Sequence, residues 1–227
     1  MEYPDLAERA AEIKSRISAA AARGGHGQSV TLVAVTKTHG PEAVEAAYRA
    51  GLADVGENKI QEATQKMSEV SAPVRWHLIG HLQRNKVKSV DQFTLVHSVD
   101  SGRLADAVHK FGIERGRAVD ALVQVNASRE DSKGGYNLAD LKPEAERLAL
   151  LPGLRVCGVM TMARIDASDA ELRETFASAR AARDVLAAAG HPARELSMGM
   201  SQDFEIAVEE GATMVRLGTT LFGAREK

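Results

Sequence analysis

The chain has 227 residues, and its 29 basic and 31 acidic side chains give a net charge of −2. This length allows one large α/β domain or two small ones, and the balanced charge argues against nucleic acid or a membrane surface as a partner. A single cysteine, Cys157, excludes an internal disulfide and a cysteine-rich zinc site.

The start of the chain and its hydropathy indicate where the protein works. Residues Met1 to Pro4 lack the basic start and apolar run of a signal peptide. No apolar run is long enough to cross a bilayer, and one cysteine suits a reducing compartment. We therefore expect a cytoplasmic protein.

The first fifty residues predict a helix, a strand and a second helix. Apolar residues at helical spacing over 6–17 predict an amphipathic helix. The β-branched run that ends at Lys37 predicts a buried strand, and a helix is expected over 42–50. Lys37 therefore lies where a strand passes into a loop. A desolvated lysine there can attack an aldehyde and form a Schiff base; a solvated lysine at the end of a strand is the simpler alternative.

The rest of the chain repeats this alternation. Seven further strands are expected at 53–56, 75–79, 94–97, 121–126, 154–160, 195–198 and 213–217. Helices are expected between them near 60–67, 83–89, 104–115, 139–150, 169–189 and 202–210, with a polar loop over 128–136. Ser101 and Ser201 are expected to begin two of these helices, and Ser168 with Glu171 predicts a capping box.

Eight strands that alternate with helices predict a parallel sheet. In a chain of about 220 residues this favours a closed (β/α)8 TIM barrel with an extra N-terminal helix over an open doubly wound sheet. The open sheet should carry a glycine-rich turn after its first strand, and residues 37–40 are a poor match to one. No linker or composition shift divides the chain, so we expect a single domain over 1–227.

In a barrel the C-terminal ends of the strands meet on one face, where chemistry is usually found. The residues expected there are Lys37, Asn58, Gly80, His81, Ser98, Asn126, Thr161, 197–201, Gly218 and Thr219. Barrel phosphate sites commonly use the loops after strands seven and eight. Ser201, Gly218 and Thr219 lie in those loops and predict an anion site, unless they serve only as a cap and a turn.

Arg216 lies within an apolar strand, where a buried charge needs a partner. The sequence leaves two partners open, an acidic residue in a structural salt bridge and a ligand. An anion site beside a lysine-bearing strand suggests a phosphorylated aldehyde as the ligand. His77 and His97 are expected to be packed core residues, and no set of residues has metal-ligand spacing.

At these residues the chain resembles the pyridoxal 5′-phosphate (PLP) homeostasis proteins, relatives of the N-terminal barrel of alanine racemase. The matching segments are Ala34-Val35-Thr36-Lys37, Val55-Gly56-Glu57-Asn58, Trp76-His77-Leu78-Ile79-Gly80-His81-Leu82-Gln83 with Asn85-Lys86, Leu196-Ser197-Met198-Gly199-Met200-Ser201 and Met214-Val215-Arg216-Leu217-Gly218-Thr219. The resemblance implies a single PLP-binding barrel without the racemase's second domain. At His81 many relatives carry proline, which alters the loop.

The resemblance also implies roles for individual residues. Lys37 would hold PLP as a Schiff base, and Ser201 with the backbone of Gly218 and Thr219 would bind its phosphate. Arg216 would face the pyridine nitrogen or contact the phosphate. An arginine at that nitrogen keeps the ring a weak electron sink. Asn58 would contact the side of the ring.

The expected function is that of a non-catalytic, monomeric PLP-binding protein that stores, buffers or delivers the cofactor, with PLP-dependent apo-enzymes as recipients. The alternatives are a PLP-dependent amino-acid racemase and a Schiff-base aldolase without PLP. Racemisation needs a second base opposite Lys37. The racemase relatives use a tyrosine of a second domain in the partner chain, and of the three tyrosines here only Tyr136 is near the expected mouth.

Overall fold

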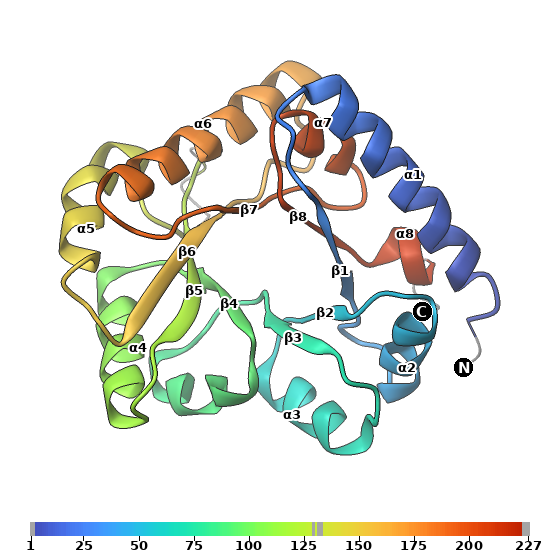
Figure 1. The fold of residues 1–227 in the computed structure, drawn as a ribbon, viewed down its shortest axis with the longest axis horizontal. Helices are drawn as coiled ribbons and strands as arrows, with labels where there is room; N and C mark the ends of the chain where they lie inside the picture. Colours follow the sequence, from blue (N-terminus) through green and yellow to red (C-terminus); the bar gives the residue numbers. More distant parts are fainter. Residues whose placement is uncertain (1–2, 129, 131–133, 224–227) are drawn as a thin grey trace.

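The computed structural model describes residues 3–128, 130 and 134–223, and it shows a closed ring of eight parallel strands inside a layer of helices (Figure 1). The strands follow one another around the ring in chain order, and β8 closes the barrel by pairing with β1. This confirms the predicted (β/α)8 barrel, and the open sheet is excluded because an open sheet would leave two unpaired edges.

Every predicted strand is present, with ends displaced by at most two residues. The fifth strand, for example, ends at Gln124 rather than Asn126. The strands are β1 (Thr31–Val35), β2 (Asp54–Glu57), β3 (Arg75–Leu78), β4 (Leu95–Val99), β5 (Val119–Gln124), β6 (Leu154–Met160), β7 (Glu195–Ser197) and β8 (Met214–Leu217). The short apolar runs therefore located the barrel wall.

The helices cover the outside of the barrel. They are α1 (Leu6–Gly24), α2 (Pro41–Arg49), α3 (Ile60–Glu69), α4 (Gly102–Glu114), α5 (Leu141–Leu148), α6 (Asp169–Ala188), α7 (Phe204–Glu209) and α8 (Thr219–Phe222), with the 3-10 helices η1 (Arg84–Gln92) and η2 (Leu138–Asp140). Across the described ranges, none of these helices has the length and apolarity needed to cross a bilayer.

The segment expected to be an α-helix over 83–89 is instead the 3-10 helix η1. Its two buried residues, Val87 and Val90, are three positions apart. The three-residue period of a 3-10 helix places both on one face, toward the core. The rest of this segment is charged or polar and supplies no wider apolar stripe for an α-helix.

The helix starts were predicted with mixed success. The capping box of Ser168 and Glu171 is confirmed at the start of α6. The prediction that Ser201 begins the following helix is wrong, because the N-cap position of α7 is Asp203, two residues later, and the Asp203 carboxylate accepts the Met200 N–H at 2.5 Å. Ser101 holds the N-cap position of α4, but its hydroxyl donates to Asp100 rather than capping the helix.

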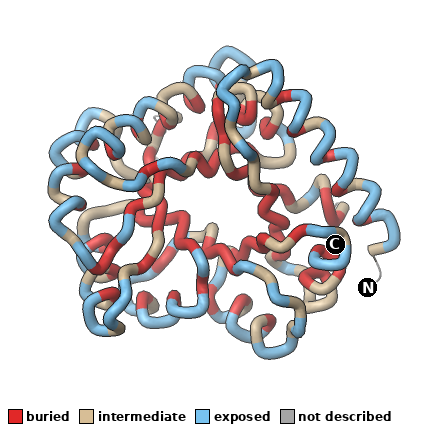
Figure 2. Tube along the Cα trace, in the orientation of Figure 1, coloured by how far each residue is buried: buried red, intermediate tan, exposed pale blue. Residues whose placement is uncertain are grey.

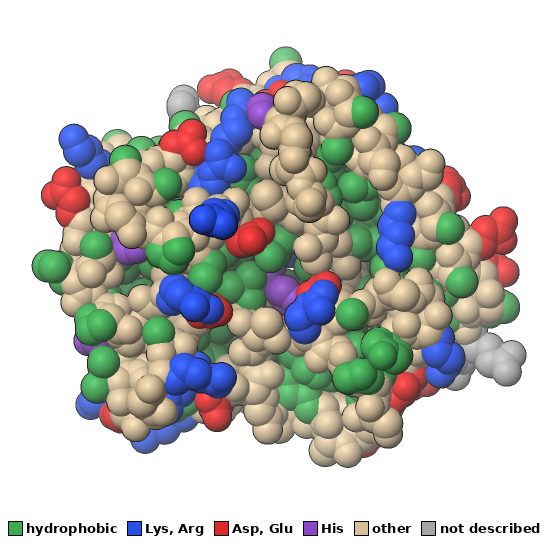
Figure 3. Space-filling model, viewed as in Figure 1, with side chains coloured by type: hydrophobic (Ala, Val, Ile, Leu, Met, Phe, Trp, Pro, Cys, Tyr) green, Lys and Arg blue, Asp and Glu red, His purple; other side chains and the backbone are tan. Residues whose placement is uncertain are grey.

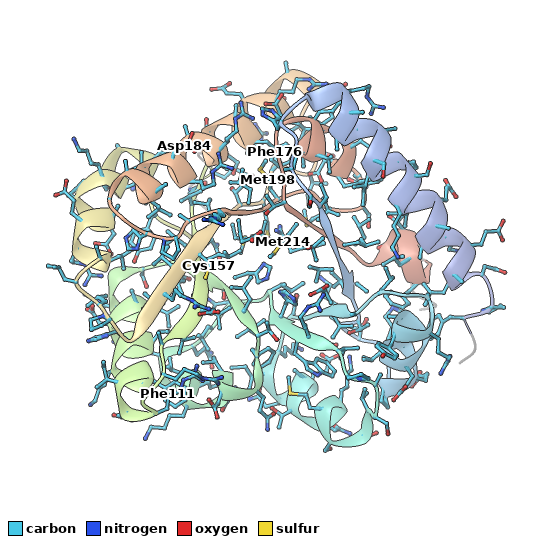
Figure 4. All side chains as sticks on the ribbon, in the orientation of Figure 1. Phe111, Cys157, Phe176, Asp184, Met198 and Met214 are labelled. Atoms are coloured by element: carbon cyan, nitrogen blue, oxygen red, sulfur yellow. The ribbon has the colours of Figure 1, made fainter. Side chains whose placement is uncertain are left out.

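The barrel separates two hydrophobic cores. Leu95, Leu122, Met160 and Met214 form a small cluster inside the ring, where Figure 4 places Met214. The larger core lies between the strands and the helices and includes Phe176. Figure 2 shows the same division as a buried inner ring with exposed outer helix faces. The interior cluster is small because polar side chains also occupy the barrel.

Helix α1 is the additional N-terminal helix, and it lies across α7 and α8 (Figure 1). Arg16 Nε donates to Glu205 of α7 at 2.9 Å, and Arg9 donates to the backbone oxygen of Leu221 in α8 at 3.1 Å. α1 therefore holds the two short helices that follow β7 and β8, the strands whose loops carry the predicted anion site.

Candidate functional site

The order of the strands brings most of the predicted site residues together. β1 lies between β2 and β8, with Val35 opposite Gly56 and Ala34 opposite Leu217. Lys37, two residues past the end of β1, is therefore flanked by Asn58 on one side and by the turn at Gly218 and Thr219 on the other. Lys37, Asn58 and Gly218 are half-buried and Thr219 is exposed, as expected at the mouth of a barrel.

The backbone around Lys37 is held in an unusual conformation. Thr38 has a φ of +68°, and within the described ranges it is the one non-glycine residue with a positive φ. A β-branched residue in the left-handed region is strained, and such strain persists only where surrounding contacts enforce it. The strain at Thr38 shows that the chain direction directly after Lys37 is imposed by other parts of the fold.

Those contacts come from α3. Lys66 Nζ donates to the backbone oxygen of Thr36 at 2.8 Å, to Glu57 at 2.7 Å and to Glu62 at 3.2 Å, while Glu62 accepts the backbone N–H of Thr38 at 2.6 Å. We call Lys66, Glu57 and Glu62 the α3 clamp. It fixes the residues on both sides of Lys37.

The α3 clamp is buried. The Lys66 side chain is 6% exposed and the Glu57 side chain is fully buried. Burial raises the pKa of Glu57, although its hydrogen bonds with Lys66 and Thr36 oppose that rise. Thr36 Oγ1 also donates to Glu57 at 2.6 Å. Thr36, the residue before Lys37, is therefore held by this outer network through both its hydroxyl and its backbone oxygen.

The loops after β7 and β8 meet beside β1. Ser201 Oγ accepts the backbone N–H of Thr220 at 3.4 Å, and the Arg216 N–H donates to the backbone oxygen of Gly199 at 3.0 Å. Gly199 has a φ of +93°, and a Cβ there would lie 2.7 Å from the Cβ of Ala207. Only glycine lets the loop pass this close to α7, and the predicted anion-binding residues are brought together as a result.

Arg216 is buried inside the barrel. Its guanidinium donates from Nη1 to Ser197 Oγ at 2.6 Å and from Nη2 to the backbone oxygen of Thr161 at 2.9 Å. Burial lowers the pKa of Arg216 to about 10, so it remains charged at neutral pH. Both of these acceptors are neutral, so neither hydrogen bond is a salt bridge.

Other residues at the strand ends have local structural contacts. Ser98 Oγ donates to the Gly80 oxygen at 2.7 Å, and Thr161 Oγ1 donates to the Val125 oxygen at 3.0 Å. His39 lies 3.0 Å from the Tyr3 hydroxyl. These residues join neighbouring loops and segments to one another.

The mouth also has a cavity beside Asn58. A space of about 220 Å³ is lined by Asn58, Lys59, His81 and Lys86, among others. His81 is exposed and lies 3.1 Å from Asp100. A larger cavity of about 510 Å³, lined by arginines and aspartates such as Arg155 and Asp120, lies where β5 and β6 begin, at the opposite end of the barrel.

Tyr136 does not extend into the mouth. It pairs with Val125 as an extension of β5 and packs against the outer core. Burial and the nearby Glu144 carboxylate raise the pKa of Tyr136. Four residues of the predicted loop, 129 and 131–133, lie outside the described residues. Among the residues that the structure describes, no cluster of His, Cys, Asp and Glu could hold a metal ion.

Comparison with known families gives a match over nearly the whole chain. The model of the alanine racemase N-terminal domain matches residues 9–226. A pyridoxal phosphate homeostasis protein of Aquifex aeolicus is 39% identical over 223 residues, which cover 96% of this chain and 98% of the relative. One of Pseudomonas aeruginosa is 41% identical over 224 residues, covering 97% and 96%.

Solved structures share the fold. PipY of Synechococcus elongatus PCC7942 with PLP bound has a TM-score of 0.84 and 38% identity, and the match covers 96% of this chain and all of PipY. Alanine racemase of Corynebacterium glutamicum has a TM-score of 0.76 at 16% identity, covering 99% of this chain and 62% of the racemase, which shows a common fold.

Proposed function

Because this chain belongs to the pyridoxal phosphate homeostasis protein family, whose barrel is that of the alanine racemase N-terminal domain, we propose that it binds PLP and stores, buffers or delivers it without turning over a substrate. PipY, its relative at 38% identity, carries PLP in its structure. We further propose a monomer of one domain over 1–227 that works in the cytoplasm and supplies PLP-dependent apo-enzymes.

One observation carries the proposal: a half-buried lysine lies between an asparagine and a turn that can bind an anion. PLP presents an aldehyde, a phosphate dianion and a pyridine ring. Lys37 offers an amine for the aldehyde, while the Ser201 hydroxyl and the backbone around Gly218 offer donors to the phosphate. Arg216 adds a buried positive charge. The residues present therefore fit the group.

Each residue has a separate part in this proposal. Lys37 holds PLP as a Schiff base, which is the chemistry that the aldehyde supplies when bound. Ser201, Gly218 and Thr219 bind the phosphate, and Asn58 contacts the side of the ring. Arg216 faces the pyridine nitrogen or the phosphate and neutralises part of the cofactor's charge. The α3 clamp sets the position from which Lys37 reacts.

The proposal is tested by adding PLP to the purified apoprotein and recording its absorbance, then reducing with borohydride and mapping the modified peptide. We expect a yellow species and a modification confined to the peptide that contains Lys37. Absence of the yellow species, or modification spread over the exposed lysines, would contradict PLP binding at this site.

Ser201→Ala should weaken PLP binding. A hydroxyl that donates to a phosphate contributes roughly 1.5–3 kcal/mol, so we expect the Kd to rise by about 10- to 150-fold. Fluorescence titration with PLP measures the change, and Ser68→Ala, which alters an exposed serine of α3, is the matched control. Equal affinities in the two variants would place the phosphate elsewhere.

We expect PLP bound to this chain to racemise amino acids slowly at most. A racemase needs a second base on the face opposite Lys37, and Tyr136 packs against the outer core instead. Incubation of the loaded protein with L-alanine in D2O measures deuterium at Cα and the yield of D-alanine. Turnover near an ordinary enzymatic rate of roughly 1 s⁻¹ or faster would favour the racemase alternative.

A further inference from the structure

Five side chains form one unbroken hydrogen-bonded chain through the interior of the barrel. The bonds run from Arg216 Nη1 to Ser197 Oγ (2.6 Å), from Ser197 Oγ to His97 Nδ1 (2.9 Å), from His97 Nε2 to His77 Nδ1 (2.9 Å) and from His77 Nε2 to Asp54 Oδ1 (3.0 Å). We call these residues the barrel relay. Since β4 and β7 are not neighbours, the bond between His97 and Ser197 crosses the barrel.

With two neutral imidazoles, the two ends of the barrel relay fix the direction of every bond in it. A guanidinium only donates and an ionised carboxylate only accepts. Ser197 therefore accepts from Arg216 and donates its own proton to His97 Nδ1. His97 must then carry its proton on Nε2, and His77 must carry its proton on Nε2 to reach Asp54. Both histidines can be neutral, and every bond is satisfied.

The charges at the two ends agree with this direction. Burial alone would raise the pKa of Asp54, but its hydrogen bonds with His77 and Arg75 outweigh burial and lower the pKa to about 2. Burial, with the neighbouring His77 and Arg216, lowers the pKa of His97 well below its usual value. The relay therefore runs from a negative Asp54 to a positive Arg216 through a neutral His97.

The acidic end opens on the face opposite the proposed PLP site. Asp54 and Arg75 are the first residues of β2 and β3, and Arg75 Nε donates to Asp54 at 2.7 Å. Figure 3 looks onto that face, where basic and acidic side chains surround a central hollow that contains a histidine. Arg75 is more than half exposed, so the relay joins the solvent-facing end of the barrel to the buried Arg216.

We propose that Asp54 is a positioning residue for Arg216 and acts on it across the barrel through His77, His97 and Ser197. This inference rests on the proposed function, because it treats Arg216 as the cation that meets bound PLP. Asp54 supplies the distant negative charge and sets the polarity of the relay. That polarity holds Nη1 on Ser197 while Nη2 donates to the Thr161 oxygen, and together these bonds set the orientation in which the guanidinium meets the cofactor.

Asp54→Asn tests the proposal because it removes the negative charge and keeps an oxygen that can accept from His77. Since Asp54 Oδ1 accepts from both His77 and Arg75 Nε, the amide should keep its oxygen on that side. We expect the loss of charge to shift the ¹⁵N resonances of His77 and, through the relay, those of His97, measured by NMR of the apoprotein. His97 does not contact Asp54, so a local packing role would leave its resonances unchanged.

The second measurement uses PLP labelled with ¹⁵N in the ring. We expect Asp54→Asn to shift the ring-nitrogen resonance and to raise the Kd for PLP by roughly 10-fold, within the usual range of coupling between sites. Asp120→Asn is the matched control, because Asp120 pairs with Arg155 on the same face outside the relay. Its spectra and affinity should match the unmodified protein.

Unchanged His97 ¹⁵N resonances in folded Asp54→Asn would overturn the proposal. If that variant does not fold, Ser197→Ala interrupts the relay instead and should shift the ring-nitrogen resonance. Ser197→Thr keeps the hydroxyl and should restore the resonance. Equal spectra for these two variants would also overturn the proposal. Failure of the unmodified protein to bind PLP would instead defeat the proposed function, while the histidine ¹⁵N measurement in the apoprotein would still stand.

Discussion

Lys37→Ala is expected to abolish covalent attachment of PLP and to leave the fold intact. The variant should show no yellow species, and borohydride should fix no cofactor, because the amine that forms the Schiff base is gone. PLP should still bind through its phosphate contacts, with a Kd raised by roughly 10- to 100-fold. Lys37 is half-buried at the mouth and outside the hydrophobic core, so the free energy of unfolding should change by roughly 1 kcal/mol or less.

The matched control is Lys59→Ala, which removes an exposed lysine beside Asn58 in the same mouth. Its spectrum and affinity should match those of the unmodified protein. Absorbance titration, borohydride trapping and thermal denaturation, run on both variants, separate loss of the reactive amine from loss of structure. A yellow species that persists in Lys37→Ala would assign the Schiff base to another lysine.

Lys66→Met is expected to cause the largest loss of stability among these variants. It leaves the fully buried Glu57 carboxylate without its cation, and breaking a buried ion pair typically costs about 3–5 kcal/mol. Protonation of Glu57 removes the unpaired charge, so the loss should be smaller at pH 5 than at pH 8. Urea denaturation at both pH values measures the free energy of unfolding.

Two further variants make this test specific. Glu57→Gln combined with Lys66→Met removes both charges and keeps an acceptor for Thr36, so it should recover most of the lost stability. Lys88→Met alters an exposed lysine whose partner Glu114 lies 3.6 Å away, and it should cost less than about 0.5 kcal/mol. A loss in Lys66→Met as small as that in Lys88→Met would show that the α3 clamp contributes little.

The α3 clamp also links stability to the proposed function. Lys66 holds the backbone oxygen of Thr36, and Glu62 holds the backbone N–H of Thr38 in its left-handed conformation. In the proposed function, the backbone held on both sides of Lys37 would lower the entropy cost of bringing its amine to an aldehyde.

The sequence by itself determined the architecture, because its signals are local. Short apolar runs alternating with helical patterns predicted all eight strands, and the capping box of Ser168 and Glu171 located the start of α6. The parallel strands of a barrel present all their C-terminal ends on the same face. This geometry placed Lys37, Ser201 and Gly218 at one end. The roles of these residues stay predictions until PLP binding is measured.

Only the tertiary structure decided which residues support the proposed site. Lys66 lies on a helix among charged residues, a pattern typical of a solvated surface, yet it reaches Thr36, 30 positions earlier. His97 and Ser197 are 100 positions apart and meet only because the barrel closes. Sequence patterns report the period of a strand or helix, whereas burial of a charge depends on which distant elements cover it.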